Sequence, residues 1–250
     1  MEAVNMKFER GIGVTTKELS KYFITLEGND GSGKGSQINS IVNFLKKRVR
    51  EINLDVNTVV ETFEPGGTYV ADQIRDLILL PIAEYKKKYG IENELMDQRA
   101  EVLLYLASRA QHTVNYIIPH LKNKEIVVCS RYADSSFAYQ GYGREINKVF
   151  DVNMLNDFAT YSLKPGLTIY LCLEDPHAGI ERKRMQKLNL DRLELEKGEF
   201  VSRVKEGFDE LLKNEPERIK AVNASKGIDD VRREIEAILD SYLLNNFQRL

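Results

Sequence analysis

The sequence feature that most constrains the fold is a glycine-rich stretch, Gly28-Asn29-Asp30-Gly31-Ser32-Gly33-Lys34-Gly35-Ser36. It follows the apolar run 22–26 and precedes a segment in which apolar residues recur at helical spacing. A glycine-rich turn between a strand and a helix points several backbone N–H groups at one spot. The helix N-terminus adds partial positive charge there, and Lys34 adds a full one. The pattern G-x-x-x-x-G-K therefore predicts a phosphate-binding loop, residues 28–36.

A flexible surface turn is the alternative interpretation of this loop. Two glycines and a lysine at this spacing arise by chance in roughly one chain of this size in ten. The strand before the loop and the helix after it favour phosphate binding. The position after the lysine, which usually supplies a Ser or Thr to magnesium, is Gly35. The metal ligands therefore stay unknown at this point, with Ser36 as a candidate.

Length and composition bound the class of protein. At 250 residues, 42% of them hydrophobic and 30% charged, the chain can bury a substantial core in one large α/β domain or two small ones. Its 36 basic and 38 acidic residues create no global field that would recruit nucleic acid or a membrane. No apolar run approaches the roughly 20 residues of a membrane span, and residues 1–21 contain no apolar signal core.

The cysteines and histidines indicate a cytoplasmic protein without a histidine metal site. Cys129 and Cys172 each lie in a β-like apolar run. Two lone buried thiols are typical of a reducing cytosol rather than of a disulfide framework. His112, His120 and His177 lack metal-ligand spacing.

Strand-like and helix-like segments alternate along the chain, which predicts a parallel sheet with right-handed crossovers. The expected strands are 22–27, 55–61, 125–129, 167–173 and 219–223. The expected helices are 34–51, a segment ending near 80, 94–123 with a bend near Pro119, 149–163, 199–213 and 229–244. A polar, aromatic loop is expected at 130–143. Ligands of such sheets bind beyond the carboxyl ends of the strands, which here are the loops beginning at Gly28, Thr62, Ser130 and Glu174.

These loops carry groups suited to a phosphorylated ligand. Arg131 can form a bidentate pair with a phosphate, and Tyr139 and Gln140 follow in the same loop. On the long helix, Tyr105 and Arg109 are i and i+4, so the ring and the guanidinium lie on one face. An aromatic face with an arginine suits a base and its phosphate, although taken alone the pair is more typical of a helix surface.

The segment 176–194 is dense in charge. Its Arg182 and Arg184 could fold over a nucleotide as a lid or simply solvate a helix, and taken alone the second interpretation is favoured. Because four loops with such groups meet at one edge of the predicted sheet, their concurrence favours a nucleotide site.

Assembled in chain order, these residues resemble the motifs of the thymidylate kinase family, the nucleoside-monophosphate kinases that phosphorylate dTMP. The similarity covers about residues 22–239. After the phosphate-binding loop, its elements are Glu64-Pro65-Gly66-Gly67-Thr68, Ala107-Ser108-Arg109-Ala110-Gln111-His112, Arg131-Tyr132-Ala133-Asp134-Ser135-Ser136-Phe137-Ala138-Tyr139-Gln140-Gly141 and Leu190-Asp191-Arg192.

The resemblance implies a fold and a domain organisation. The fold is a three-layer α/β P-loop kinase fold with a sheet of about five parallel strands, helices on both faces and a small helical lid. One domain would span 22–245, with the lid at about 176–194, after an N-terminal extension at 1–21. The resemblance also implies a homodimer.

The resemblance implies roles for the matching residues. ATP would be bound by Gly28, Asn29, Asp30, Gly31, Ser32, Gly33, Lys34, Gly35, Ser36 and Arg192. The acceptor dTMP would be contacted by Asp30, Glu64, Arg75, Tyr105, Arg109, Arg131, Ser136, Tyr139 and Gln140. Catalysis would be carried by Lys34, Arg131, Arg182 and Arg184.

Within the acceptor site, the resemblance implies a division of labour. Arg75 and Arg131 would clamp the dTMP phosphate, and Asp30 would accept from the 3′-hydroxyl. Tyr105 would stack on thymine, whose edge would be addressed by Arg109, Ser136 and Gln140. Tyr139 would crowd the place of a 2′-hydroxyl, and Glu64 would orient an arginine or a water. The adenine of ATP would lie near 223–225.

The implied reaction is ATP-dependent phosphorylation of dTMP to dTDP with Mg2+, without a covalent intermediate. Three positions depart from the family pattern: Gly35, Ser130 in place of an aspartate, and Phe63 in place of an arginine. Two alternatives stay open. One is a related deoxynucleoside-monophosphate kinase with a shifted base preference, since small pocket changes redirect such sites. The other is a nucleotide-binding protein with impaired catalysis.

Overall fold

The computed structural model describes residues 15–80, 87, 90, 96–185, 193, 196 and 198–247. Its five strands form one parallel sheet in the order β2-β3-β1-β4-β5. They are β1 (Phe23–Gly28), β2 (Val59–Phe63), β3 (Ile126–Ser130), β4 (Leu167–Cys172) and β5 (Ile219–Asn223). The predicted α/β fold with five parallel strands is confirmed.

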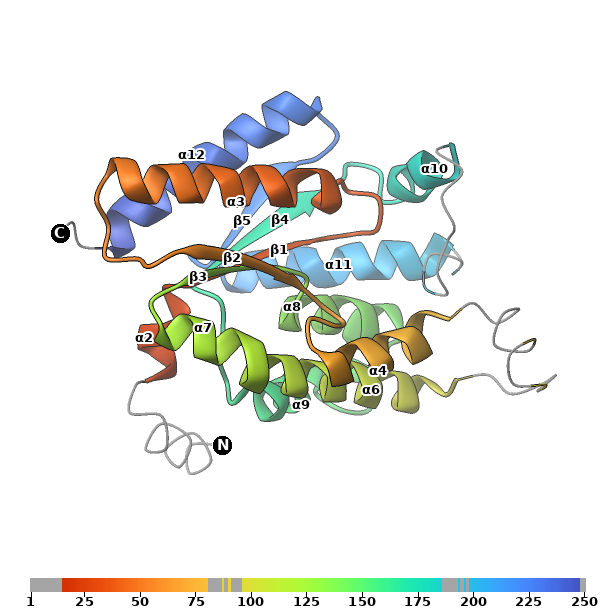
Figure 1. The fold of residues 1–250 in the computed structure, drawn as a ribbon. Coiled ribbons are helices and arrows are strands. Elements are labelled where there is room, and N and C mark those ends of the chain that lie inside the picture. Colours follow the sequence, from red (N-terminus) through yellow and green to blue (C-terminus); the bar gives the residue numbers. More distant parts are fainter. Residues whose placement is uncertain are drawn as a thin grey trace.

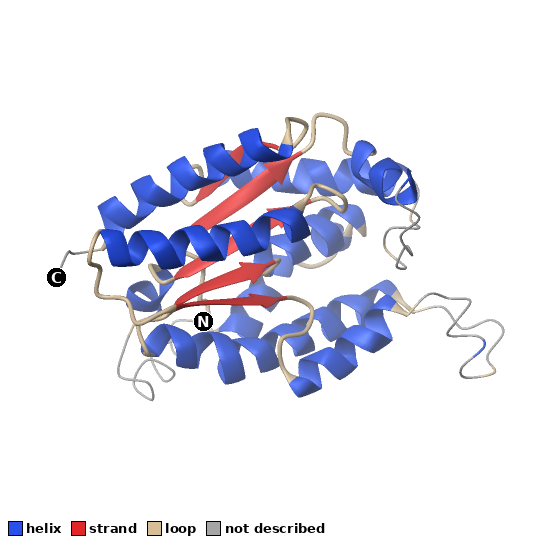
Figure 2. Ribbon diagram, turned by 45° about the horizontal axis from the view of Figure 1, so that its top comes forward, coloured by secondary structure: helices blue, strands red, loops and turns tan. Residues whose placement is uncertain are grey.

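Helices cover both faces of the sheet. One face carries α3 (Lys34–Glu51) and α12 (Ile228–Asn246), and the other carries α7 (Ile118–Lys122), α8 (Ala133–Ser136) and α11 (Gly198–Asn214), as Figure 1 shows. Figure 2 gives the same layers from a tilted view. Beyond α11 and α8 lie α4 (Tyr69–Leu79), α6 (Gln98–His112) and α9 (Val152–Thr160). Within the described residues, no helix is both long and apolar enough to cross a membrane.

The central strand β1 is buried along its whole length, between β3 and β4. A strand covered on both faces must be apolar, which explains the run Phe23-Ile24-Thr25-Leu26. Its one side-chain hydroxyl is satisfied inside the sheet, because Thr25 Oγ1 lies 2.7 Å from Thr168 Oγ1 on β4. The strand therefore delivers the phosphate-binding loop to the middle of the carboxyl edge.

Helix α3 begins at Lys34, directly after Gly33, whose φ is 92°. Its buried residues Ile41, Val42, Leu45 and Val49 pack in the main core cluster, as the predicted helical stripe requires. The predicted bounds of this helix, 34–51, are confirmed, and so are those of β5, 219–223.

Four predicted elements need correction. Strand β2 begins at Val59 rather than at 55. The long helix does not continue uniformly to 123: α6 ends at His112, and a π-helical turn, η1 (Thr113–Ile117), precedes α7 and Pro119. Residues 94 and 95 lie outside the described part of the chain. The helix predicted at 149–163 is shorter, since the Asp151 side chain caps α9 and Tyr161 ends it with a φ of 54°.

The fourth correction concerns the loop expected at 130–143. This segment is helical, as α8 followed by a π-helical stretch, η2 (Phe137–Gly143). It packs on α11, where a Cβ added to Gly207 would lie 2.8 Å from the Ala138 Cα. Tyr139 and Gln140 are buried there and have hydrogen-bond partners inside the protein. The polar side chains of this segment therefore did not indicate an exposed loop.

The N-terminal segment expected as an extension is partly described. Thr15 caps the short helix α2 (Thr16–Ser20) with a reciprocal capping box. Leu19 on this helix is 2% exposed and belongs to the main core cluster. Residues 15–21 are therefore anchored to the domain, and residues 1–14 lie outside the described part.

Candidate active site

The phosphate-binding loop wraps its own lysine. Lys34 Nζ donates to the carbonyl oxygens of Gly28 and Asn29, each at 2.8 Å, and lies 3.4 Å from Ser32 Oγ. Burial and the neighbouring Arg131 guanidinium lower the pKa of Lys34 to about 7, although Asp30 and Glu27 oppose this shift. The Lys34 side chain is thus held by carbonyl and hydroxyl oxygens, which are neutral and which an anionic ligand can replace.

The first turn of helix α10 (Ala178–Met185), in the segment predicted as a lid, contacts this loop directly. Gly31 has a φ of 71°, and a Cβ added there would lie 2.0 Å from the Gly179 carbonyl oxygen. A Cβ on Gly179 would likewise lie 2.0 Å from the Asp30 carbonyl oxygen. The two backbones touch, which requires glycine on both sides.

A second cation stands beside the loop at the end of β3. The Arg131 guanidinium pairs with Asp30 and donates to Tyr139 Oη at 3.1 Å, and its carbon lies 4.9 Å from the Tyr139 ring centroid. Tyr139 Oη also donates to Asp30 Oδ2 at 2.9 Å. Arg131 has a φ of 67°, a conformation that costs a non-glycine residue free energy and is frequent at functional sites.

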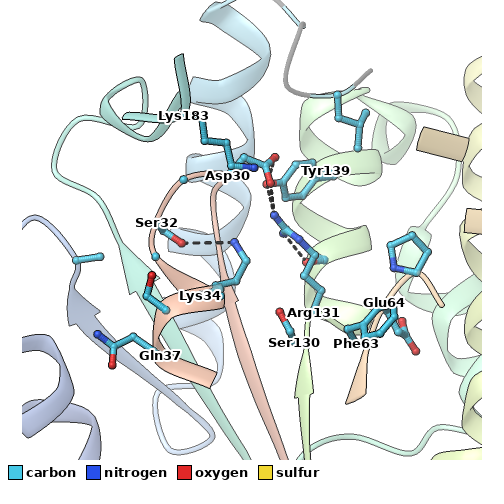
Figure 3. A pocket seen from close by; sticks show the side chains of 18 of the residues that line it. Asp30, Ser32, Lys34, Gln37, Phe63, Glu64, Ser130, Arg131, Tyr139 and Lys183 are labelled. Atoms are coloured by element: carbon cyan, nitrogen blue, oxygen red, sulfur yellow. Dashed lines mark hydrogen bonds and ion pairs between the residues drawn. The ribbon is translucent and has the colours of Figure 1, made fainter. Parts of the chain in front are cut away.

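Buried Glu27 anchors the turn that carries Arg131. Its carboxylate accepts from the Tyr132 backbone N–H at 2.7 Å and from Ser135 Oγ at 2.6 Å. Ser135 Oγ in turn accepts from Arg131 Nη1 at 3.1 Å. Burial, reinforced by the nearby Asp134 carboxylate, raises the pKa of Glu27. Figure 3 shows Arg131 between Lys34 and Glu64, with its guanidinium directed toward Asp30.

The floor of the pocket is a buried polar network around Arg109, which is 2% exposed. Its Nε donates to Glu64 Oε2 at 2.8 Å, and its remaining groups donate to three further oxygens: Ser136 Oγ at 2.8 Å, Asn156 Oδ1 at 2.7 Å and the Tyr132 carbonyl at 2.9 Å. The other Glu64 oxygen lies 3.1 Å from His112 Nδ1. Every member is satisfied, so the network fixes these side chains before any ligand binds.

Gln140 is held by a second network. Its Nε2 donates to Glu101 Oε1 at 3.3 Å, and Arg144 donates to both Glu101 oxygens at 3.1 Å. Arg144 also pairs at 2.6 Å with Glu196, which follows α10 in the chain. Gln140, which lines the pocket, is therefore connected through Glu101 and Arg144 to Glu196.

These groups border one cavity of about 710 Å³. Most of the predicted site residues line it: Asp30, Gly31, Ser32, Gly33, Lys34, Gly35, Ser36, Glu64, Arg75, Tyr105, Arg109, Arg131, Ser136, Tyr139, Gln140 and Arg182. The described residues Gly28, Asn29 and Arg184 do not line it. Asn29 turns to α11, where it donates to the Val201 carbonyl at 3.3 Å. Arg192 lies outside the described residues.

Several lining residues were not among the predicted site residues. Lys183, not Arg184, faces the cavity from α10, and Phe63 and Ser130 line it at the ends of β2 and β3. Near the predicted adenine position, Ala224 is joined by Lys226 and Ile228. The dense charge of the segment 176–194 indicated this part of the chain but did not distinguish Lys183 from Arg184. Phe63, a half-exposed aromatic at the end of a strand, was marked in the sequence only as a departure from the family pattern, with no role predicted for it.

The structure combines a parallel sheet, a glycine-rich phosphate loop with a lysine at the start of the next helix, and an arginine-lined cavity beside that loop. These features define the class of P-loop kinases that act on small phosphorylated substrates. A family model described as Thymidylate kinase matches residues 26–235. The chain belongs to the thymidylate kinase family, and it is an enzyme of the transferase class.

Individual relatives agree with the family match. The chain is 40% identical to the thymidylate kinase of Clostridium novyi (strain NT) over 218 residues, which cover 87% of this chain and 97% of that protein. It is 38% identical to the thymidylate kinase of Acaryochloris marina (strain MBIC 11017), over 88% of this chain and 96% of that protein. The crystal structure of thymidylate kinase from Ehrlichia chaffeensis superimposes with a TM-score of 0.63 at 31% identity, covering 87% and 97% of the two chains.

Proposed function

We propose that this protein transfers the terminal phosphoryl group of ATP to dTMP, giving ADP and dTDP. The observation that supports this is one cavity that is lined both by the phosphate-binding loop with Lys34 and by the cations Arg75 and Arg131. Following ADP release with dTMP as acceptor tests the reaction, because each transfer yields one ADP. If the protein binds ATP and dTMP but no ADP is formed, it is instead a nucleotide-binding protein with impaired catalysis.

The donor would occupy the loop side of the cavity. Backbone N–H groups at the start of α3 and Lys34 would bind the phosphates of ATP, with the adenine near Ala224. Arg182 lines this side and donates to the Ala224 carbonyl at 3.3 Å. Together with Arg184 and Arg192 it would close over ATP, neutralise the transferring phosphoryl group and exclude water.

The acceptor would occupy the side of β2, β3 and α6. Tyr105 would stack on the base, with Arg109, Ser136 and Gln140 at its edge. Arg75 and Arg131 would bind the phosphate of dTMP. Asp30 would accept from the 3′-hydroxyl and Tyr139 would crowd the 2′-position. Because Asp30 now pairs with Arg131 and Tyr139, sugar binding would exchange part of that pairing for contacts with the ligand.

Catalysis would consist of positioning and charge neutralisation. Phosphoryl transfer needs the donor and acceptor oxygens in line, and little covalent chemistry is left to the protein. Arg131 stands where the two substrates would meet, and its contacts with Ser135 and Tyr139 hold its guanidinium before they bind. A preorganised cation avoids reorganisation at the moment of reaction.

Mg2+ would accompany ATP. Among the residues that the structure describes, no cluster of three or more His, Cys, Asp and Glu side chains could hold a metal. Ser36 and Ser130 line the cavity with hydroxyl groups, and the lining carboxylates of Asp30 and Glu64 are paired with arginines. These oxygen donors fit an ion that is carried by the nucleotide phosphates and keeps several waters, as Mg2+ commonly does. When bound, it would neutralise phosphate charge.

ATP binding is expected to take up a proton at Lys34. In the free protein, burial and Arg131 lower the Lys34 pKa to about 7, so the amine is mostly neutral at about pH 8.5, where ATP phosphates are fully ionised. The bound triphosphate would raise this pKa, so proton uptake should approach one per ATP. Affinity should consequently fall as the pH rises above about 7.

Calorimetry in two buffers of different ionisation enthalpy measures this uptake. The matched control is Lys34→Arg, whose guanidinium stays charged and should bind ATP without taking up a proton. Equal binding heats for the unmodified protein in both buffers would contradict the expectation.

A homodimer would form through the outer layer of helices. Large apolar side chains are exposed along this layer on α4, α6 and α9, among them Tyr69 at 80%, Leu103 at 58% and Phe158 at 78%. An apolar surface built by three neighbouring helices is typical of a protein interface, and a second copy of this chain is the proposed occupant. Sedimentation should give a dimer for the unmodified protein and a monomer for Phe158→Glu. Leu244→Glu, on α12, is the control that should stay dimeric, and a monomeric unmodified protein would overturn the proposal.

A further inference from the structure

Arg75 differs electrostatically from Arg109 and Arg131, the other two arginines proposed to contact the acceptor nucleotide. Arg109 pairs with Glu64, and Arg131 pairs with Asp30. Arg75 has no carboxylate partner within 4.0 Å among the described residues. Its charge is therefore the least compensated of the three, which suits it to bind an anionic ligand.

Two neutral groups hold the Arg75 guanidinium in place. Nη1 donates to the Pro65 carbonyl oxygen at 2.7 Å. The guanidinium carbon lies 5.2 Å from the centroid of the Phe63 ring, a cation–π contact. One face and one nitrogen are thus engaged, which leaves the remaining N–H groups for a phosphate.

Phe63 is itself fixed, although it is 44% exposed. It is the last residue of β2 and pairs in register with Ser130 of β3. Its ring packs on Gly66, where an added Cβ would lie 2.6 Å from the ring edge. Figure 3 shows Phe63 in the pocket beside Glu64. An aromatic ring that stacks on a guanidinium at the edge of a ligand cavity restricts the orientation of that guanidinium.

We propose that Phe63 is a positioning residue that holds Arg75 toward the phosphate of the acceptor nucleotide. The inference rests on the proposed function, because the anion is the phosphate of dTMP. The ring supplies no charge and covers one face of the guanidinium. The edge that forms bidentate hydrogen bonds stays open to a phosphate.

Calorimetric titration with dTMP and with thymidine, which lacks the phosphate, tests this role. Phe63→Leu keeps an apolar side chain and removes the ring face. It should weaken dTMP binding by about five- to twenty-fold, in line with cation–π contacts, and leave thymidine binding unchanged. Phe63→Tyr keeps the ring and should bind dTMP like the unmodified protein. In turnover, Phe63→Leu should raise the KM for dTMP and leave the KM for ATP unchanged.

A double-mutant cycle isolates the coupling to Arg75. In an Arg75→Met background, Phe63→Leu should cause no further loss of dTMP affinity. Equal losses for dTMP and thymidine, or additive losses in the cycle, would overturn the inference, because Phe63 would then merely shape the pocket. An unmodified protein that binds thymidine but not dTMP would instead overturn the proposed function, so the two failures are distinguishable.

Discussion

Arg131→Ala is expected to lower the rate of dTMP phosphorylation by a factor of about 10³ or more while the fold is retained. Arg131 lines the cavity between Lys34 and Glu64 (Figure 3) and is held by Asp30, Ser135 and Tyr139. Removing it would withdraw the cation from the place where the donor and acceptor phosphates would meet. Steady-state kinetics with saturating ATP and dTMP measure the loss.

Two controls separate this loss from a loss of structure. Arg131→Lys keeps the charge without the planar fork, and should recover only part of the activity. Arg233→Ala removes an exposed arginine that pairs with Asp230 on α12, and should leave turnover unchanged. Turnover of Arg131→Ala close to that of the unmodified protein, with an unchanged melting temperature, would refute the assigned role.

Arg109→Met should produce the largest loss of stability in the site. The substitution leaves the Glu64 carboxylate, 3% exposed, without its guanidinium, and it leaves Ser136 and Asn156 without a donor. Breaking a buried ion pair on one side costs about 3–5 kcal/mol, which corresponds to a fall in melting temperature of roughly 6–20 °C for a chain of this size. Thermal unfolding followed by circular dichroism measures it, and dTMP affinity should fall with it.

A paired substitution tests whether the uncompensated charge is the cause. Glu64→Gln in the Arg109→Met background removes the buried negative charge and should recover part of the lost melting temperature. Glu64→Gln alone, which unpairs Arg109, should be destabilising. An Arg109→Met protein that melts within about 2 °C of the unmodified one would contradict the account of the buried network.

The sequence was sufficient to predict the framework because its signals are local. The apolar run of β1, the glycine-rich loop and the helical stripe of α3 follow one another without interruption, and this order favours a phosphate-binding loop over a flexible surface turn. The segment 130–143 was mispredicted because its polar side chains are satisfied in the interior. Tyr139 and Gln140 find their partners on segments far away in the chain, Asp30 and Glu101.

The sequence predicted many of the residues that line the candidate site, but it did not predict which of them contact one another. Spacing placed Tyr105 and Arg109 on one helix face, and both line the cavity. Spacing could not indicate that Arg109 would be buried with Glu64, because that pair depends on how α6 packs against the turn after β2. In α10 the apolar residues mark no consistent face, so the sequence could not decide between Lys183 and Arg184.

Acceptor-dependent release of ADP, compared across dTMP, dUMP, dCMP and dGMP with and without Mg2+, tests the central claim most directly. We expect kcat/KM to be highest for dTMP and turnover to require Mg2+, because phosphoryl transfer needs the negative charge of the ATP phosphates to be neutralised. A higher kcat/KM for another nucleotide would contradict the assignment of dTMP as the acceptor and would identify that nucleotide as the preferred one. Absence of ADP release with every acceptor would contradict phosphoryl transfer by this protein.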